Sequence, residues 1–200
     1  MLSNKKYTLF IEEKITDISK EKFILDLGGG ARFQKWLSKY EPLFDQDSYH
    51  TMDIDDTTGP DIIGDIHQIP LSDGSVDAII CSSVLEHVEN PILAVREMYR
   101  ILKKGGKLFI YVPSTYPYHA RVGHYPDMWR FFDDSLIFMC KDFSTLEICK
   151  FGGYFKALSF FVPFQHKIQK VLSPLAAFFD WLLRTKNRHT TAGYYIYAIK

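Results

Sequence analysis

Ile24-Leu25-Asp26-Leu27-Gly28-Gly29-Gly30 joins a short apolar run to three consecutive glycines. An apolar run of this length is typical of a strand that is buried on both faces of a parallel sheet. Because glycine has no Cβ, the turn that follows such a strand can bring its backbone close to a small ligand. The stretch therefore predicts an α/β protein whose first strand ends at a ligand site.

Strand-like and helix-like runs alternate outward from this stretch. Wholly apolar strands between helices are typical of a mostly parallel sheet with helices on both faces, and ligands bind at the carboxyl ends of its strands. The predicted strands are 23–27, 49–54, 61–64, 76–81, 107–112, 145–149 and 193–200, and the predicted helices are 1–22, 32–39, 90–103, 135–141 and 165–184. Asn90 is the expected cap of the helix over 90–103, and the last helix is expected to break near Pro174. Residues 115–135, rich in His, Tyr, Pro, Trp and Arg, are predicted to form a functional loop.

The composition indicates one folded domain, residues 1–200. Lys+Arg and Asp+Glu both total 24, and this balance makes a nucleic-acid partner unlikely. The three cysteines, Cys81, Cys140 and Cys149, form no CxxC pair, which favours buried thiols in a reducing compartment over a metal site. The first 22 residues lack the apolar centre of a signal peptide, and no apolar run is long enough to span a membrane. We therefore expect a cytoplasmic protein without a metal.

The glycine turn by itself leaves the ligand open. A dinucleotide-binding turn has its third glycine where this chain has Phe33, and a phosphate-binding loop would continue into Gly-Lys-Ser/Thr. Neither pattern is complete here. The turn thus favours a nucleoside ligand that lacks a pyrophosphate.

Two later aspartates support such a ligand. Asp53 lies 23 residues after Gly30, about the spacing at which a carboxylate reaches ribose hydroxyls. The alternative, a solvated turn, is the favoured interpretation for Asp55 and Asp56. Asp65 can accept from an adenine amino group while the next backbone N–H donates to a ring nitrogen. Taken alone, however, Asp65 is better interpreted as a loop residue that caps its own turn.

Six motifs follow one another between residues 23 and 114. They are 24–30, 51–55, 64–71, 75–80, 84–88 and 100–108. In order and spacing they resemble the class I S-adenosylmethionine-dependent methyltransferases, in particular the type 11 methyltransferase domain. The segment 125–131 is similar to one that follows the fifth strand in some members. The resemblance implies a Rossmann-like, doubly wound, seven-stranded sheet, with 1–22 as a helical lead-in, 23–114 as the cofactor-binding core and 115–200 on the acceptor side.

The resemblance also implies S-adenosyl-L-methionine as the cofactor. In this pattern the glycine turn passes the methionine part, Asp53 holds the ribose hydroxyls, Asp65 and Ile66 hold the adenine, and two serines line the methionine side. The implied cofactor-binding residues are Asp26, Gly28, Gly29, Gly30, Asp53, Ile54, Asp65, Ile66, Ser82 and Ser83. One position departs from the pattern. Arg32 replaces a further glycine, so that its side chain can narrow the turn or contact the cofactor carboxylate.

Methyl transfer from a sulfonium needs alignment of the acceptor and, for a hydroxyl or amine, a base that takes its proton. His119 and His124 are the candidate catalytic bases, because neutral imidazole titrates near neutral pH. Packing or capping of the loop is an equally weighted alternative for both. His87 is expected to orient its loop. A small molecule, a sugar, a lipid head group and a protein all remain open as the acceptor.

Residues 168–184 are strongly apolar and are flanked by basic residues. The flanking residues are Lys167, Lys170, Arg184, Lys186 and Arg188. A lid or packing helix is the favoured interpretation, and peripheral membrane contact is the alternative. For the whole chain, the prediction is a methyltransferase, and the alternative is a non-catalytic relative that works through a partner.

Overall fold

The computed structural model describes residues 2–163, 165–185 and 189–200. In these ranges the strands form one seven-stranded sheet in the order β3-β2-β1-β4-β5-β7-β6. Neighbours from β3 to β5 pair in parallel, whereas β7 is antiparallel to both β5 and β6, so the predicted mostly parallel sheet is confirmed. The strands are β1 (Ile24–Leu27), β2 (Tyr49–Asp53), β3 (Ile62–Ile63), β4 (Val76–Ser82), β5 (Leu102–Pro113), β6 (Thr145–Lys150) and β7 (Gly193–Ile199).

The glycine turn lies where the strand order changes direction. All four residues of β1 are buried, and Leu27 pairs with Met52 of β2 on one side and with Cys81 of β4 on the other. The chain first extends the sheet to one side, through β2 and β3, and then returns to add β4 on the other side of β1. The carboxyl ends of these parallel strands therefore meet at a switch point, which is where α/β sheets bind ligands.

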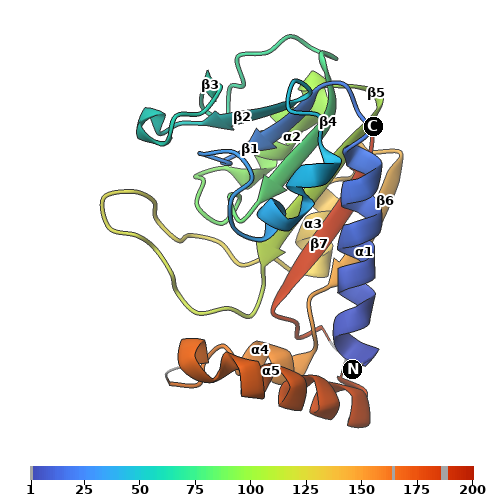
Figure 1. Ribbon diagram of the computed structural model, residues 1–200, viewed down its shortest axis with the longest axis vertical. Helices are drawn as coiled ribbons and strands as arrows, with labels where there is room; N and C mark the ends of the chain where they lie inside the picture. The colour runs from blue at the N-terminus through green and yellow to red at the C-terminus, as the bar shows by residue number, and fades with distance from the viewer. Residues whose placement is uncertain (1, 164, 186–188) are drawn as a thin grey trace.

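Helices cover both faces of the sheet (Figure 1). On one face lie α1 (Leu2–Ile18) and the 3-10 helix η1 (Lys35–Leu43), which bury Ile15 and Leu37 against the strands. On the other face lie α2 (Pro91–Ile101) and α3 (Asp133–Met139), whose buried residues include Met98 and Leu136. Asn90 caps α2 as predicted, since its side chain accepts a 3.0 Å hydrogen bond from the N–H of Leu93.

The segment after the glycine turn differs from the prediction. It is not an α-helix over 32–39 but the irregular 3-10 helix η1, which begins at Lys35 and contains Pro42. The reason is Phe33, whose φ of +53° is left-handed and interrupts a right-handed helix. Its buried ring stacks on Tyr49, with the ring centroids 4.1 Å apart. A short 3-10 helix, η2 (Asp56–Thr58), also follows β2.

Two helices, α4 (Tyr154–Leu158) and α5 (Gln165–Leu182), lie together at one end of the molecule, beside the start of α1 (Figure 1). The fully buried carboxylate of Asp180 on α5 accepts hydrogen bonds of 2.9–3.1 Å from the N–H groups of Gly153, Phe155 and Lys156, and so caps α4. The expected break at Pro174 is wrong, because α5 continues through it. None of the helices in the described ranges is long and apolar enough to cross a membrane.

Candidate active site

A cavity of about 910 Å³ opens at the carboxyl ends of β1, β2 and β4. The glycine turn, the end of β2 and the segment after β3 line one side of it. The loop after β4 and the long segment 116–128 line the other. Seven of the predicted cofactor-binding residues line this cavity: Gly28, Gly30, Asp53, Ile54, Asp65, Ile66 and Ser83.

The glycine turn follows a path that side chains would block. Gly28 has a φ of +68°, and a Cβ there would lie 2.4 Å from a methyl carbon of Val84. Gly30 has a φ of +50°, and a Cβ there would lie 2.8 Å from the amide nitrogen of Gln34. Both positions therefore favour glycine for their left-handed backbone conformation, and Gly28 also needs it for space beside Val84. The bare backbone of the turn forms part of the cavity wall, which fits the close approach of a cofactor.

Asp26 and Gly29 lie behind the turn rather than at the cavity surface. The Asp26 carboxylate is buried and accepts a 2.5 Å hydrogen bond from the hydroxyl of Tyr49. Burial raises the pKa of Asp26 to about 7, against the lowering effect of the Tyr49 hydroxyl. A Cβ on Gly29 would lie 2.6 Å from the same carboxylate. Asp26 thus supports the turn from within the fold.

Arg32 is not among the residues that line the cavity. Its guanidinium forms an ion pair with Asp61, 3.2 Å away, and donates to the backbone oxygen of Gln46 at 3.0 Å. Asp61 in turn accepts from the backbone N–H of Thr51 on β2. Arg32 therefore links the turn to the second strand through Asp61. The arginine that stands in place of a glycine here does not narrow the cavity.

Acidic side chains lie at the ends of β2 and β3, as the sequence predicts. Asp53 Oδ1 accepts a 3.0 Å hydrogen bond from the N–H of Asp55, which fixes this carboxylate at the cavity wall. Asp65 accepts from the N–H of His67 at 2.8 Å, and this bond is the main cause of the lowered pKa of Asp65. Asp65 caps its own turn, as one of its two interpretations predicts, and it also lines the cavity, where its contact with adenine stays a prediction.

The two serines after β4 have different surroundings. Ser82 accepts a 3.0 Å hydrogen bond from the indole of Trp36 and does not contribute to the cavity wall. Ser83 lines the cavity and has a left-handed φ of +57°, which is uncommon for a residue with a side chain. Such backbone strain is concentrated at functional sites.

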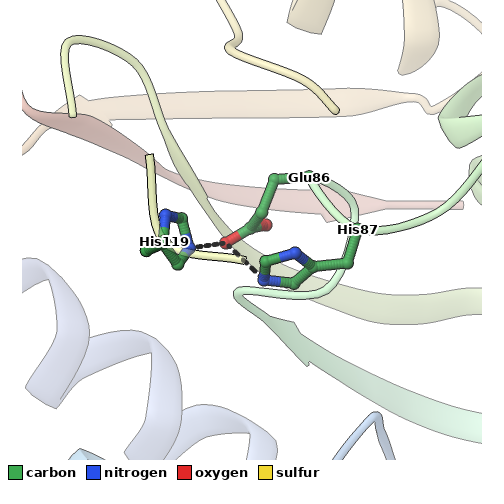
Figure 2. Close-up of side chains that lie close together, drawn as sticks. All are labelled: Glu86, His87 and His119. Carbon is green, nitrogen blue, oxygen red and sulfur yellow. Dashed lines mark ion pairs between the residues drawn. The ribbon is translucent and has the colours of Figure 1, made fainter. Parts of the chain in front are cut away.

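Glu86, His87 and His119 face one another across the second side of the cavity (Figure 2). Glu86 Oε1 lies 3.7 Å from His87 Nε2 and 3.8 Å from His119 Nε2. The Glu86 side chain is only 1% exposed, and the neighbouring Glu86 carboxylate is the main cause of the raised pKa of His119. The sequence analysis missed Glu86. Its only sequence signal is its place in the motif 84–88, because its burial depends on residues far along the chain.

The loop that carries His119 is held by a second ion pair. Asp127 lies 2.5 Å from Arg130, which lowers the pKa of Asp127 to about 2. The same carboxylate accepts a 2.8 Å hydrogen bond from the N–H of His119. His124, the other predicted base, is exposed on this loop and lines the cavity without joining Glu86. The structure thus brings His119, and not His124, to the buried carboxylate.

The chain is similar to methyltransferases in sequence and in structure. The family model described as "Methyltransferase domain" matches residues 25–110. A ubiquinone biosynthesis O-methyltransferase of Xanthomonas oryzae pv. oryzae is 51% identical over 37 residues, which are 18% of this chain and 16% of that protein. The first curated relatives are matched over only 18%, 23% and 16% of their own lengths.

Two solved structures show the same fold over nearly the whole chain. A SAM dependent methyltransferase from Archaeoglobus fulgidus superimposes with a TM-score of 0.63 at 16% identity, covering 99% of this chain and 95% of that one. Phosphoethanolamine N-methyltransferase 2 of Haemonchus contortus, in complex with S-adenosyl-L-methionine, gives 0.58 at 12% identity and covers 96% and 52%. The predicted resemblance is confirmed over residues 25–110, which match the methyltransferase-domain model, and the chain has the Rossmann-like fold of solved S-adenosylmethionine-dependent methyltransferases.

Proposed function

We propose that this protein binds S-adenosyl-L-methionine in the 910 Å³ cavity and transfers its methyl group to a small-molecule, sugar or lipid-type acceptor. One observation carries the proposal. A single cavity joins the bare glycine turn and the predicted ribose and adenine residues on one side to the cluster of Glu86, His87 and His119 on the other. A cofactor on the first side would present its sulfonium methyl to an acceptor on the second.

The cofactor would be held by the residues that line the first side. The Asp53 carboxylate would accept hydrogen bonds from both ribose hydroxyls. Asp65 and the backbone N–H of Ile66 would read the adenine edge, and Ile54 would add apolar contact. The backbone of Gly28 and Gly30 leaves room for the methionine part. The sulfonium supplies the activated methyl group, so the chain's own residues mainly have to align the acceptor.

The acceptor's proton would be removed at the cluster rather than at His124. Glu86, His87 and His119 converge on one point of the cavity wall, whereas His124 is exposed on the loop. We therefore propose that His119, and not His124, takes part in the reaction. The thiols of Cys81, Cys140 and Cys149 are all buried and free, which supports a reducing, cytoplasmic location.

Calorimetric titration with S-adenosylmethionine and with its demethylated product, S-adenosylhomocysteine, tests the cofactor step. We expect saturable binding of both, at about one molecule per chain, because seven of the predicted cofactor-binding residues line one cavity. Labelled cofactor with a panel of hydroxylated, amine and lipid acceptors then tests transfer. Absence of binding for both compounds would remove the enzyme proposal. Binding without transfer to any acceptor class would favour the alternative, a cofactor-binding relative that works through a partner.

We further propose that α5 binds to a membrane surface, which is the alternative interpretation of residues 168–184. Its side chains leave a large apolar surface in solvent, with Val171 70% exposed and Trp181 52% exposed. Lys167, Lys170 and Arg184 are exposed around it and would favour anionic lipid head groups. The two other predicted basic residues, Lys186 and Arg188, lie outside the described residues.

Co-sedimentation with anionic vesicles tests this contact. We expect the protein to pellet with vesicles that contain phosphatidylserine, and we expect Val171→Ser/Trp181→Ser to remain in the supernatant because the apolar face is lost. Ile137→Ser is the matched control, since Ile137 on α3 is also 52% exposed and lies away from α5. Equal pelleting of the double variant, or none of the wild type, would leave α5 as a packing helix only.

A further inference from the structure

The two histidines of the cluster are both held in one tautomer. His87 Nδ1 lies 2.5 Å from the backbone oxygen of Pro126, and His119 Nδ1 lies 3.1 Å from that of Pro117 and 3.1 Å from Asp127. Carbonyl oxygens only accept hydrogen bonds, so each Nδ1 must carry a hydrogen. In a neutral imidazole, Nε2 is then an unprotonated acceptor. When the two rings are neutral, both Nε2 atoms are therefore free to offer lone pairs.

Both lone pairs are directed at a third acceptor. The two Nε2 atoms face Oε1 of Glu86 at 3.7 and 3.8 Å (Figure 2). Two unprotonated nitrogens and a carboxylate oxygen have no hydrogen to share, so they repel one another unless a positive charge lies among them. Two neutral histidines and one carboxylate therefore need a further, positively charged group between them.

The Glu86 carboxylate is buried and only partly hydrogen-bonded. The side chain is 1% exposed, and within the described residues its Oε2 has no hydrogen-bond partner. A buried carboxylate oxygen without a hydrogen-bond partner is unfavourable. Arg130, on the loop that carries His119, forms its ion pair with Asp127, 2.5 Å away, and not with Glu86. While both imidazoles are neutral, no described residue thus forms an ion pair that neutralises the buried Glu86 carboxylate.

We propose that Glu86, His87 and His119 bind a divalent transition-metal ion, a site that the sequence analysis did not predict. The three ligand atoms lie within 4.8 Å of one another, and all three residues line the cavity. Bonds of about 2.0–2.2 Å to an ion such as Zn²⁺ or Mn²⁺ need only small side-chain rotations from these separations. Two imidazoles and one carboxylate suit such ions better than Ca²⁺ or Mg²⁺, which prefer oxygen. The hydrogen bonds at both Nδ1 atoms are those that orient histidines on metals.

Three protein ligands leave a coordination position open toward the cavity. A hydroxyl of the acceptor bound there would lose its proton to solvent, since a metal lowers the pKa of a bound hydroxyl. The resulting oxygen would then attack the sulfonium methyl, forming the C–O bond as the C–S bond breaks and its electron pair returns to sulfur. This part of the inference rests on the proposed function and selects a hydroxyl-bearing acceptor. The metal site itself does not depend on that function.

Metal titration of the chelator-treated protein tests the site directly. We expect about one equivalent of Zn²⁺ or Mn²⁺ to bind, and we expect Glu86→Gln and His119→Ala to bind at least about tenfold more weakly, because each loses a ligand. His124→Ala is the matched control for adventitious binding by an exposed loop histidine, and it should keep the wild-type metal affinity. Equal metal affinity in wild type and Glu86→Gln would overturn the proposal.

Thermal unfolding gives a readout that needs no acceptor. Metal should raise the Tm of the wild type and leave that of Glu86→Gln unchanged, since binding to the folded state stabilises it. Without metal, Glu86→Gln should unfold at a higher temperature than the wild type, because the buried charge is removed. S-adenosylhomocysteine binding is measured on the same samples. Metal binding without cofactor binding would contradict the proposed function alone, and cofactor binding without metal binding would contradict the metal site alone.

Discussion

Replacing Asp53 by alanine is expected to weaken the binding of S-adenosylhomocysteine by about 10- to 100-fold. The Asp53 carboxylate is fixed at the cavity wall by the N–H of Asp55, and β2 ends there beside the glycine turn. In the proposed complex it accepts hydrogen bonds from two vicinal ribose hydroxyls. Hydrogen bonds to a charged group contribute about 1.5–3 kcal/mol, which corresponds to the expected loss. Calorimetry on the folded variant measures it.

Asp56→Ala is the matched control for this experiment. Asp56 is a carboxylate on the same segment, but it is exposed and does not line the cavity. We expect its affinity for the cofactor product to stay within about twofold of the wild type, as for a typical surface substitution. If Asp53→Ala bound as tightly as Asp56→Ala, the ribose would have to lie elsewhere, and the proposed orientation of the cofactor would be wrong.

The parts of the fold that depend on local pattern were predictable from the sequence. The apolar runs of β1 and β4 are buried strands because a sheet covered on both faces needs apolar residues at every position. Asn90 before Pro91 identifies the start of α2 because both residues meet the needs of a first helical turn. The strand ends then place Asp53 and Asp65 at the cavity, since parallel strands present their carboxyl ends on one edge.

The parts that depend on distant partners were not predictable in the same way. α4 is only five residues long, and its first N–H groups are bound by Asp180, which follows much later in the chain. No sequence pattern around residues 154–158 predicts that Asp180 caps this helix. Likewise, Glu86 and His119 are brought together by the loop that Asp127 and Arg130 hold in place. A buried carboxylate facing two histidines is a property of this tertiary contact.

The buried carboxylate behind the glycine turn is expected to make the stability of the protein fall as pH rises. The pKa of Asp26 is raised to about 7, chiefly by burial, whereas in the unfolded chain it is about 3.9. Between these values the folded state keeps a proton that the unfolded chain has released. Raising the pH through this window therefore lowers the free energy of unfolding, by about 4 kcal/mol for a change of this size, and the loss levels off above pH 7. Urea unfolding from about pH 4 to 8 measures the slope.

Asp26→Asn isolates this contribution, because its amide oxygen can still accept from the Tyr49 hydroxyl while the side chain no longer ionises. We expect the variant to be more stable than the wild type above pH 7 and to lose the advantage toward pH 4. Tyr49→Phe should act in the opposite direction, since losing the hydroxyl raises the pKa of Asp26 further and extends the fall in stability to higher pH. Asp47→Asn, at an exposed position, should follow the wild-type curve. If the free energy of unfolding of Asp26→Asn changed with pH as it does in the wild type, Asp26 would be ionised throughout this range. The carboxylate behind the glycine turn would then be charged.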